Sequence, residues 1–206
     1  MLKLPKVTLC AVGSEKYRDQ QQKILDYSSA YIEFGAIKNI IADIPNIDEW
    51  NRFIVYELGD YIDTEYAILV HPDGGIGNPF AWDNKWLEYD FIGSPFPLPT
   101  DDFSYRDVNG VIQRVGNSVS LRSKKLLQLP KKIGMEWKPF HGFYNEDGFV
   151  SVNMRHVFEE HGCKFAPFEE AVKFGMETPL PEHEGKVPFV FHKHYGFNSK
   201  YPNFEI

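Results

Sequence analysis

The stretch Tyr66-Ala67-Ile68-Leu69-Val70-His71-Pro72-Asp73-Gly74-Gly75 decides how the fold is interpreted. The unbroken apolar run from Ala67 to Val70 is typical of a strand buried on both faces in the middle of an α/β sheet. A histidine, a proline and an aspartate follow it, and ligands of open α/β sheets bind just beyond the carboxyl ends of the strands. Asp73 is therefore a candidate metal or phosphate ligand. Asp and Gly are equally favoured in tight turns on steric grounds, so the stretch alone leaves both interpretations open.

Strands and helices alternate in the first part of the chain. The expected order is a strand at 7–12, a helix at 15–28, a strand at 31–41, a helix at 47–58 and a strand at 66–70. In the second helix the apolar residues recur at helical spacing, and Asp48 and Glu49 lie where a helix N-terminus favours negative charge. This order predicts an α/β fold with a mostly parallel central sheet flanked by helices.

The second half of the sequence is less regular. The expected elements are a strand at 90–93, a surface loop at 95–110, a strand at 119–121, a helix at 124–129 capped by Ser123, a helix at 149–161, and strands at 164–167 and 187–191. A loop as long as the one at 95–110 is usually functional or mobile. No repeat, flexible linker or second hydrophobic unit is visible, so we expect one domain over residues 1–206.

Composition excludes several classes of protein. The 206 residues are 43% hydrophobic, which is enough for a sizeable core, and the formal net charge of −7 argues against non-specific nucleic-acid binding. Cys10 and Cys163 lie in apolar surroundings and predict reduced thiols of an intracellular protein. No run approaches the length of a membrane span, and the N-terminus lacks the apolar stretch of a signal peptide. A cytoplasmic protein without a membrane span is expected.

Two further clusters carry polar groups at strand ends. In Gly116-Asn117-Ser118-Val119-Ser120, backbone N–H groups and the Asn117 amide could approach a sugar, although an ordinary turn is the simpler interpretation. After the apolar run at 187–191 come His192, Lys193 and His194. Strand alternation would place the two histidines on one side and the lysine on the other if the strand continued that far. Imidazole is a ligand for Mn²⁺-type ions and lysine is a point charge for phosphate, whereas a solvated strand end is the plainer alternative.

A pair of acids, Glu146 and Asp147, stands at the start of a predicted helix. Acidic residues at that place cap the helix and offset its dipole, so a structural role is the default. Two adjacent acids are more than a cap requires. One of them is therefore a candidate general base that projects into a cleft.

Taken together and in order, these clusters resemble the GT-A class of nucleotide-sugar glycosyltransferases, and in particular a compact family of bacteria and large DNA viruses first described as a domain of unknown function. The resemblance covers most of the chain, from the first strand to His194. It rests on these segments: 66–74, Tyr89-Asp90-Phe91-Ile92-Gly93-Ser94-Pro95, Gly116-Asn117-Ser118-Val119-Ser120-Leu121-Arg122-Ser123, Asn145-Glu146-Asp147 and Phe191-His192.

The resemblance implies a role for each cluster. Ala11, Val12 and Gly13 would line the pocket for the nucleotide base. His71, Pro72 and Asp73 would stand in place of an Asp-X-Asp motif, with Asp73 retained as the metal ligand and His71 near the ribose or metal-bound water. His192 would be a second metal ligand, Lys193 would contact the diphosphate, and Gly116 and Asn117 would face the donor sugar. Asp147, beside Glu146, would deprotonate the acceptor. Because His71 replaces a carboxylate, metal affinity should depend heavily on His192.

The implied activity is metal-dependent transfer of a hexose or deoxyhexose from a UDP-sugar to a hydroxyl of a glycan or glycoprotein, in the cytoplasm of the host if the protein is viral. Mn²⁺ or Mg²⁺ would be the ion, and a single base suggests inversion. A nucleotidyltransferase is less favoured, because the segment after the first strand, Gly13-Ser14-Glu15-Lys16, has a single glycine. A carbohydrate-binding module without turnover stays open, since these aromatic residues could stack on sugars: Trp82, Trp86, Phe96, Tyr105 and Trp137.

Overall fold

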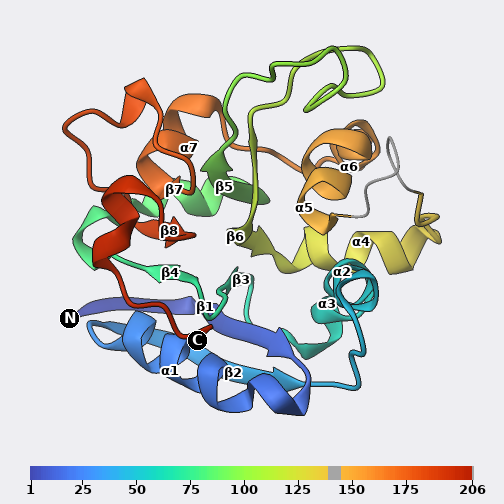
Figure 1. Ribbon diagram of the computed structural model, residues 1–206. Coiled ribbons are helices and arrows are strands. Elements are labelled where there is room, and N and C mark those ends of the chain that lie inside the picture. Colours follow the sequence, from blue (N-terminus) through green and yellow to red (C-terminus); the bar gives the residue numbers. More distant parts are fainter. Residues whose placement is uncertain (139–144, 206) are drawn as a thin grey trace.

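The computed structural model describes residues 1–138 and 145–205, and its centre is a five-stranded sheet (Figure 1). In the spatial order β2-β1-β3-β6-β5, the strands are Ile32–Ile41, Leu2–Gly13, Tyr66–Leu69, Val115–Ser123 and Phe91–Pro95. β1 pairs in parallel with β2 and β3, whereas β6 runs antiparallel to both β3 and β5. Four strands thus share one direction, and the predicted mostly parallel mixed sheet is confirmed.

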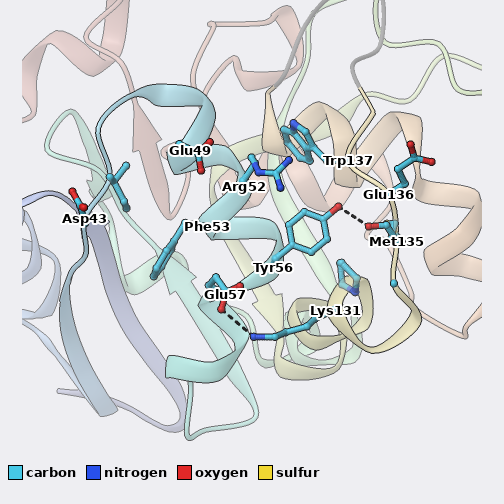
Figure 2. Close-up of a pocket in the computed structure, with 13 residues that line it drawn as sticks. Asp43, Glu49, Arg52, Phe53, Tyr56, Glu57, Lys131, Met135, Glu136 and Trp137 are labelled. Carbon is cyan, nitrogen blue, oxygen red and sulfur yellow. Dashed lines mark hydrogen bonds and ion pairs between the residues drawn. The ribbon is translucent and has the colours of Figure 1, made fainter.

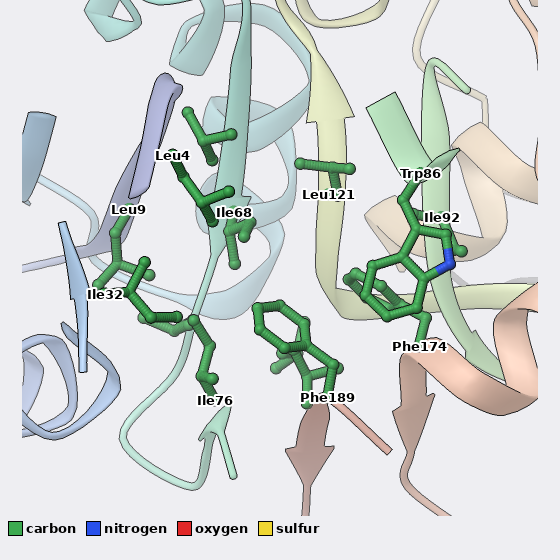
Figure 3. Close-up of a cluster of buried hydrophobic side chains, with 14 of the residues drawn as sticks. Leu4, Leu9, Ile32, Ile68, Ile76, Trp86, Ile92, Leu121, Phe174 and Phe189 are labelled. Carbon is green, nitrogen blue, oxygen red and sulfur yellow. The ribbon is translucent and has the colours of Figure 1, made fainter. Parts of the chain in front are cut away.

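The central strands are buried on both faces, as the apolar run of β3 predicts. Leu9 and Ile68 contribute to one buried cluster, and their chain neighbours Cys10 and Leu69 contribute to another. This split follows from the two-residue period of a strand, which sends successive side chains to opposite faces. Figure 3 shows the first cluster, in which Leu9, Ile68 and Leu121 of the sheet face Ile76 and Phe189.

A small second sheet covers this first face, together with two helices. It consists of β4 (Gly74–Ile76), β8 (Val190–His192) and β7 (Gly175–Met176), and the helices are α1 (Arg18–Ser29) and α7 (Phe168–Phe174). Trp86, from the 3₁₀ helix Asn84–Glu88, is fully buried against the rings of Phe174 and Phe189. Trp86 is therefore a core residue, and the suggestion that it stacks on a sugar is wrong.

The other face is covered by α2 (Ile47–Tyr56), α3 (Leu58–Tyr61) and α4 (Lys124–Ile133). Both α2 and α4 start at a side-chain cap, because the first N–H groups of a helix have no partner within it. The Asn46 side chain accepts a hydrogen bond from the Glu49 N–H at 2.9 Å. Ser123 Oγ accepts from the Leu126 N–H at 3.0 Å, which confirms the predicted cap.

The predicted helix at 149–161 is broken and begins earlier. α5 spans Glu146–Gly148, a π-helical turn spans Phe149–Asn153, and α6 spans Arg155–Glu160. The Met154 N–H bonds the carbonyl of Phe149, five residues back, at 2.8 Å, which widens the helix at this point. Such π turns are rare in proteins, and those that occur often lie at functional sites.

Two late strands also differ from expectation. Residues 164–167 contribute one isolated bridge, between Phe165 and Phe91, and no strand. The strand expected at 187–191 is β8 at Val190–His192, because Pro188 has no N–H to donate to a ladder. The alternation expected for His192 and His194 is wrong, since Lys193 takes a left-handed φ of 62° and ends the strand.

The long loop between β5 and β6 is confirmed and projects from one end of the molecule (Figure 1). Its turns are held by carboxylates that accept backbone N–H groups, Asp101 from Phe103 and Asp107 from Asn109, both at 2.9 Å. Near its end, the Gln113 side chain accepts a hydrogen bond from Arg155 at 2.6 Å. In the part of the chain that the structure describes, no helix is both long and apolar enough to cross a membrane.

Candidate active site

His71, Pro72 and Asp73 form a tight turn between β3 and β4. The His71 N–H donates to the Gly74 carbonyl at 2.8 Å, and the Gly74 N–H donates back to the His71 carbonyl at 2.9 Å. Asp73 can therefore be both a turn residue and a ligand, because the turn itself fixes the direction of its side chain. That carboxylate is 3% exposed. A buried carboxylate requires partners.

The pairing of β4 with β8 supplies the first partner. Gly74 is opposite His192 in the antiparallel register, and His192 Nε2 lies 3.5 Å from Asp73 Oδ1. The approach requires a glycine, since a Cβ at position 74 would lie 2.7 Å from the His192 ring. Lys193 supplies the second partner. Its left-handed backbone turns the chain so that its N–H bonds the Asp73 carbonyl at 3.0 Å and its Nζ lies 2.6 Å from Asp73 Oδ2.

Glu177, directly after β7, joins the site although no role was predicted for it. Its Oε1 lies 3.4 Å from His192 Nδ1, and its Oε2 accepts a hydrogen bond from the Asn117 amide at 2.6 Å. The fully buried Asn198 holds the two segments together, because its amide donates to the Met176 carbonyl at 2.8 Å and to the His192 carbonyl at 3.2 Å. No sequence pattern points to Glu177, because β7 before it has only two residues.

The two carboxylates determine the protonation of His192. Burial by itself would lower the pKa of His192, but its close contacts with Asp73 and Glu177 and their negative charges raise it to about 9. Burial would likewise raise the pKa of Asp73, and the contacts with His192 and Lys193 outweigh it and hold that pKa well below its usual range. The imidazole is thus positively charged at neutral pH, between the carboxyl groups of Asp73 and Glu177.

His71 and Trp50 lie beside this cluster. The His71 ring is 5.4 Å from that of His192 and 5.1 Å from that of Trp50, and the Trp50 indole N–H donates to the Val12 carbonyl at 2.9 Å. Burial, reinforced by the charge of His192, lowers the pKa of His71 to about 3, so this ring is neutral. In the sequence, Trp50 is one of the apolar residues at helical spacing in the helix at 47–58. The structure places it at the carboxyl edge of the sheet.

Ala11, Val12 and Gly13 end β1 at this same edge. Ala11 and Val12 are buried in the clusters on the two faces of the sheet. Gly13 lies against α1, where a Cβ would come within 2.3 Å of the Gln21 amide. What this edge offers a ligand is therefore mostly backbone and the rings of Trp50 and His71.

Gly116 and Asn117 belong to β6 and not to a turn before it. Asn117 has a φ of 79°, and its side-chain oxygen accepts a hydrogen bond from the Val119 N–H at 3.0 Å. A left-handed backbone costs about 1–3 kcal/mol in a residue other than glycine, and such strain gathers at functional sites. Gly116 is covered by Phe96, whose ring carbon would lie 2.0 Å from a Cβ. Of the two residues, Asn117 reaches the cluster directly, through Glu177.

Glu146 and Asp147 have opposite environments. Glu146 is fully buried, and its Oε2 lies 2.7 Å from an Arg122 guanidinium nitrogen. Asp147 is half-buried and accepts the Gly148 N–H at 2.8 Å. Burial raises the pKa of Asp147, Glu146 and Glu177 add to the rise, and the Gly148 N–H and Arg122 oppose it, leaving a pKa of about 7. Glu177 thus contacts His192 and also raises the pKa of Asp147, which links the two parts of the site electrostatically.

The two predicted metal ligands, Asp73 and His192, lie close together in the structure. Among residues 1–138 and 145–205, no group of three His, Cys, Asp or Glu side chains could hold an ion. Two side chains of this kind could share an ion, since Asp73 Oδ1 and His192 Nε2 lie 3.5 Å apart. Ligand bonds of about 2.1 Å separate two ligands of one ion by roughly 3.0–3.4 Å, so this spacing suits a shared ion. Mg²⁺ is commonly held by one or two protein ligands together with substrate phosphates, so this pair fits an ion that arrives with a diphosphate.

A separate cavity of about 650 Å³ lies on the outer side of α2 (Figure 2). Phe53, Tyr56 and Trp137 contribute aromatic walls. None of the predicted nucleotide, metal or base residues lines the cavity, and Trp137 is the one lining residue that was expected to stack on a sugar. Trp137 lies 4.6 Å, ring to ring, from Phe149, which follows α5 directly. Through Trp137 the cavity lies close to Phe149, two residues after Asp147. Neither Asp73 nor His192 lines it.

Comparisons with known proteins agree with this architecture. The chain resembles the structure of a glycosyltransferase involved in the glycosylation of the major capsid of PBCV-1, with a TM-score of 0.58, 11% identity, and coverage of 94% of this chain and 95% of that one. It also resembles an active-site mutant of LgtC, with a TM-score of 0.51, 13% identity, and coverage of 90% and 86%. At such identities the likeness shows the fold, which is the predicted GT-A-like one.

Sequence comparison is more limited. No curated protein sequence matches the chain. A family model described as "Protein of unknown function (DUF5672)" matches residues 37–192, a segment that contains Asp73, Asn117, Asp147, Glu177 and His192. This segment is well over half of the 206 residues, and the chain therefore belongs to the DUF5672 family.

Proposed function

We propose that the chain is a metal-dependent glycosyltransferase that moves a hexose or deoxyhexose from a UDP-sugar to a hydroxyl of a glycan or protein-linked acceptor. The observation that carries the proposal is the pair Asp73 and His192, whose facing atoms are 3.5 Å apart at the carboxyl edge of the sheet. The likeness in fold to two glycosyltransferases supports the reaction class. Asp147, with a pKa of about 7, supplies a base close to neutral pH.

On the donor side, Asp73 and His192 would hold Mn²⁺ or Mg²⁺. A bound divalent ion would offset the charge that develops on the departing nucleoside diphosphate. Lys193 is 38% exposed at its side chain, so its ammonium group can contact Asp73 and a diphosphate oxygen together. Asn117 and Gly116 would face the sugar. The base and ribose would lie against Ala11, Val12 and Gly13 and against the turn at His71 and Pro72.

On the acceptor side, Asp147 would take the proton of the attacking hydroxyl. The acceptor oxygen forms the new bond to the anomeric carbon while the bond from that carbon to the diphosphate oxygen breaks. The transition state has oxocarbenium character, as in glycoside hydrolysis. Attack from the face opposite the leaving group inverts the configuration. Product stereochemistry by NMR tests this step, and retention would remove Asp147 from the role of base.

Thermal unfolding with and without Mn²⁺ tests the donor site, because a ligand that binds only the native state raises the melting temperature. UDP with Mn²⁺ should raise it in the wild type and in Asp26→Ala, which removes an exposed carboxylate of α1. Asp73→Ala should abolish the rise. If no nucleoside diphosphate with metal stabilises the wild type, the proposal is wrong. A glycan-binding module would keep its sugar ligand in Asp73→Ala, and a nucleotidyltransferase would respond to triphosphates.

A further inference from the structure

Arg122 and Glu146 form an ion pair in the interior, at 2.7 Å, with side chains that are 1% and 0% exposed. Arg122 belongs to β6, and it also donates from Nε to Ser120 Oγ at 2.9 Å and lies over the Phe91 ring at 5.4 Å. Taking two charges out of water costs several kcal/mol per ion, so an apolar pair of similar volume is often as stable or more stable. Stability alone is therefore a poor reason for this pair.

Glu146, one member of the ion pair, directly precedes Asp147 in the sequence. The backbone N–H of Glu146 donates to the Asn51 side chain of α2 at 3.0 Å, while its carboxylate meets Arg122 of β6. Glu146 is thus held from two elements, and α5 lies beside β6 (Figure 1). The Asp147 carbonyl in turn accepts from Ser151 Oγ at 2.6 Å. The place from which the Asp147 carboxylate projects is set by these contacts.

We propose that Arg122 and Glu146 are a positioning pair for Asp147, which fixes the start of α5 and places one negative and one positive buried charge around the base. The role assigned to Asp147 rests on the proposed function, whereas the effect of the pair on its carboxylate does not. Glu146 thereby acts through Asp147 and not on the acceptor, since its own carboxylate is sealed from solvent.

Four charged or titratable groups interact electrostatically with the Asp147 carboxylate. Glu146 from α5 and Glu177 after β7 are negative, Arg122 from β6 is positive, and Tyr105 of the long loop has a pKa raised by burial, by Glu177 and by Asp147. The negative charge of Glu146 favours the protonated form of Asp147, and Arg122 favours the ionised form. Burial is the largest cause of the raised pKa of Asp147, and these charges adjust it to about 7, where general-base catalysis is most effective.

Glu146→Gln tests the pair, because the amide keeps the shape and removes the charge. The carboxyl ¹³C resonance of Asp147, assigned by its loss in Asp147→Asn, should titrate roughly one pH unit lower than in the wild type, the size expected for a nearby like charge. Glu170→Gln is the matched control, since Glu170 is also buried and pairs instead with Lys85, Trp86 and Lys173. In the control the Asp147 titration should not move. The titration needs no substrate.

Two further variants keep the test decisive if Glu146→Gln fails to fold. Arg122→Met with Glu146→Leu replaces the pair with apolar groups of similar volume and should fold. Because Glu146 raises the pKa of Asp147 more than Arg122 lowers it, the Asp147 titration of this variant should move to lower pH. Arg122→Lys keeps the charge, and its Asp147 titration should stay near pH 7. If Glu146→Gln and the apolar double variant fold and titrate as the wild type does, the pair is structural only and the proposal is wrong. Wild-type protein that binds no nucleoside diphosphate, while the Glu146→Gln titration still moves, would refute the transferase alone.

Discussion

His192 Nε2 lies 3.5 Å from Asp73 Oδ1, although 119 residues of sequence separate the two side chains. The contact follows from the β4–β8 register, in which Gly74 is opposite His192. In the metal-free protein the two groups form an ion pair, and the same two atoms are the candidate metal ligands. Proton and metal therefore compete for one place, and this competition gives the first prediction.

Metal affinity should depend steeply on pH. Since His192 has a pKa of about 9, it must lose a proton before it can ligate, so Mn²⁺ affinity should rise about tenfold per pH unit up to pH 9. Calorimetry with Mn²⁺ at pH 6, 7 and 8 measures this slope and the proton released. An affinity that is constant over this range would show that His192 is not a ligand.

Without metal, the same group makes stability depend on pH in the opposite direction. The folded pKa of about 9 lies above the ordinary histidine value of 6.5. The pairing of charged His192 therefore stabilises the fold fully below pH 6.5, and this contribution is lost as the pH rises from 6.5 to 9. Urea unfolding of wild type and His192→Gln across this range measures the loss. Equal pH dependence in the two proteins would contradict it.

Glu177→Gln should weaken metal binding although Glu177 need not touch the ion. Its carboxylate faces the other imidazole nitrogen of His192, and carboxylates placed in this way orient ligating histidines. We expect metal affinity to fall roughly 10–100-fold, the usual effect of losing such a partner. Exposed Glu184→Gln, on the segment after the 3₁₀ helix Pro181–His183, should leave affinity unchanged. Unchanged affinity in Glu177→Gln would mean that Asn198 alone positions the imidazole.

Gly74→Ala should disrupt the Asp73–His192 contact by steric overlap. The new Cβ would lie 2.7 Å from the His192 ring, 2.8 Å from Val119 and 3.0 Å from the Phe191 carbonyl. We expect a loss of about 1–3 kcal/mol in unfolding free energy, as for overpacked cores, together with loss of Mn²⁺-dependent UDP binding. Gly148→Ala is the control for stability, because nothing lies within 4 Å of its Cβ. Wild-type UDP binding in Gly74→Ala would contradict the prediction.

Asp147→Asn should separate binding from turnover. If Asp147 is the base, kcat should fall about 10²–10⁴-fold while the affinity for UDP with Mn²⁺ is retained. Because the pKa of Asp147 is about 7, wild-type turnover should fall about tenfold per pH unit below pH 7, as the base becomes protonated. Steady-state rates from pH 5 to 9 measure this limb. Turnover in Asp147→Asn within tenfold of the wild type would assign the base elsewhere.

The sequence by itself determined the elements whose physics is local. The apolar run of β3 requires burial on both faces, and Leu9, Cys10, Ile68 and Leu69 are divided between two clusters as a period of two demands. Ser123 caps α4 because its hydroxyl lies within reach of the Leu126 N–H. Asp73 lies just beyond the carboxyl end of β3, because the apolar run that forms this strand stops directly before it.

Only the tertiary structure decided which of the residues at that edge meet. Glu177 follows a strand of two residues, too short for a pattern, and reaches His192 and Asn117 because β7 pairs with β8. Glu146 and Asp147 read alike in the sequence, and they differ because Arg122, brought in by β6, neutralises one of them in the core. Contacts between distant segments depend on register and burial, and these are properties of the packed sheet and not of any single stretch of chain.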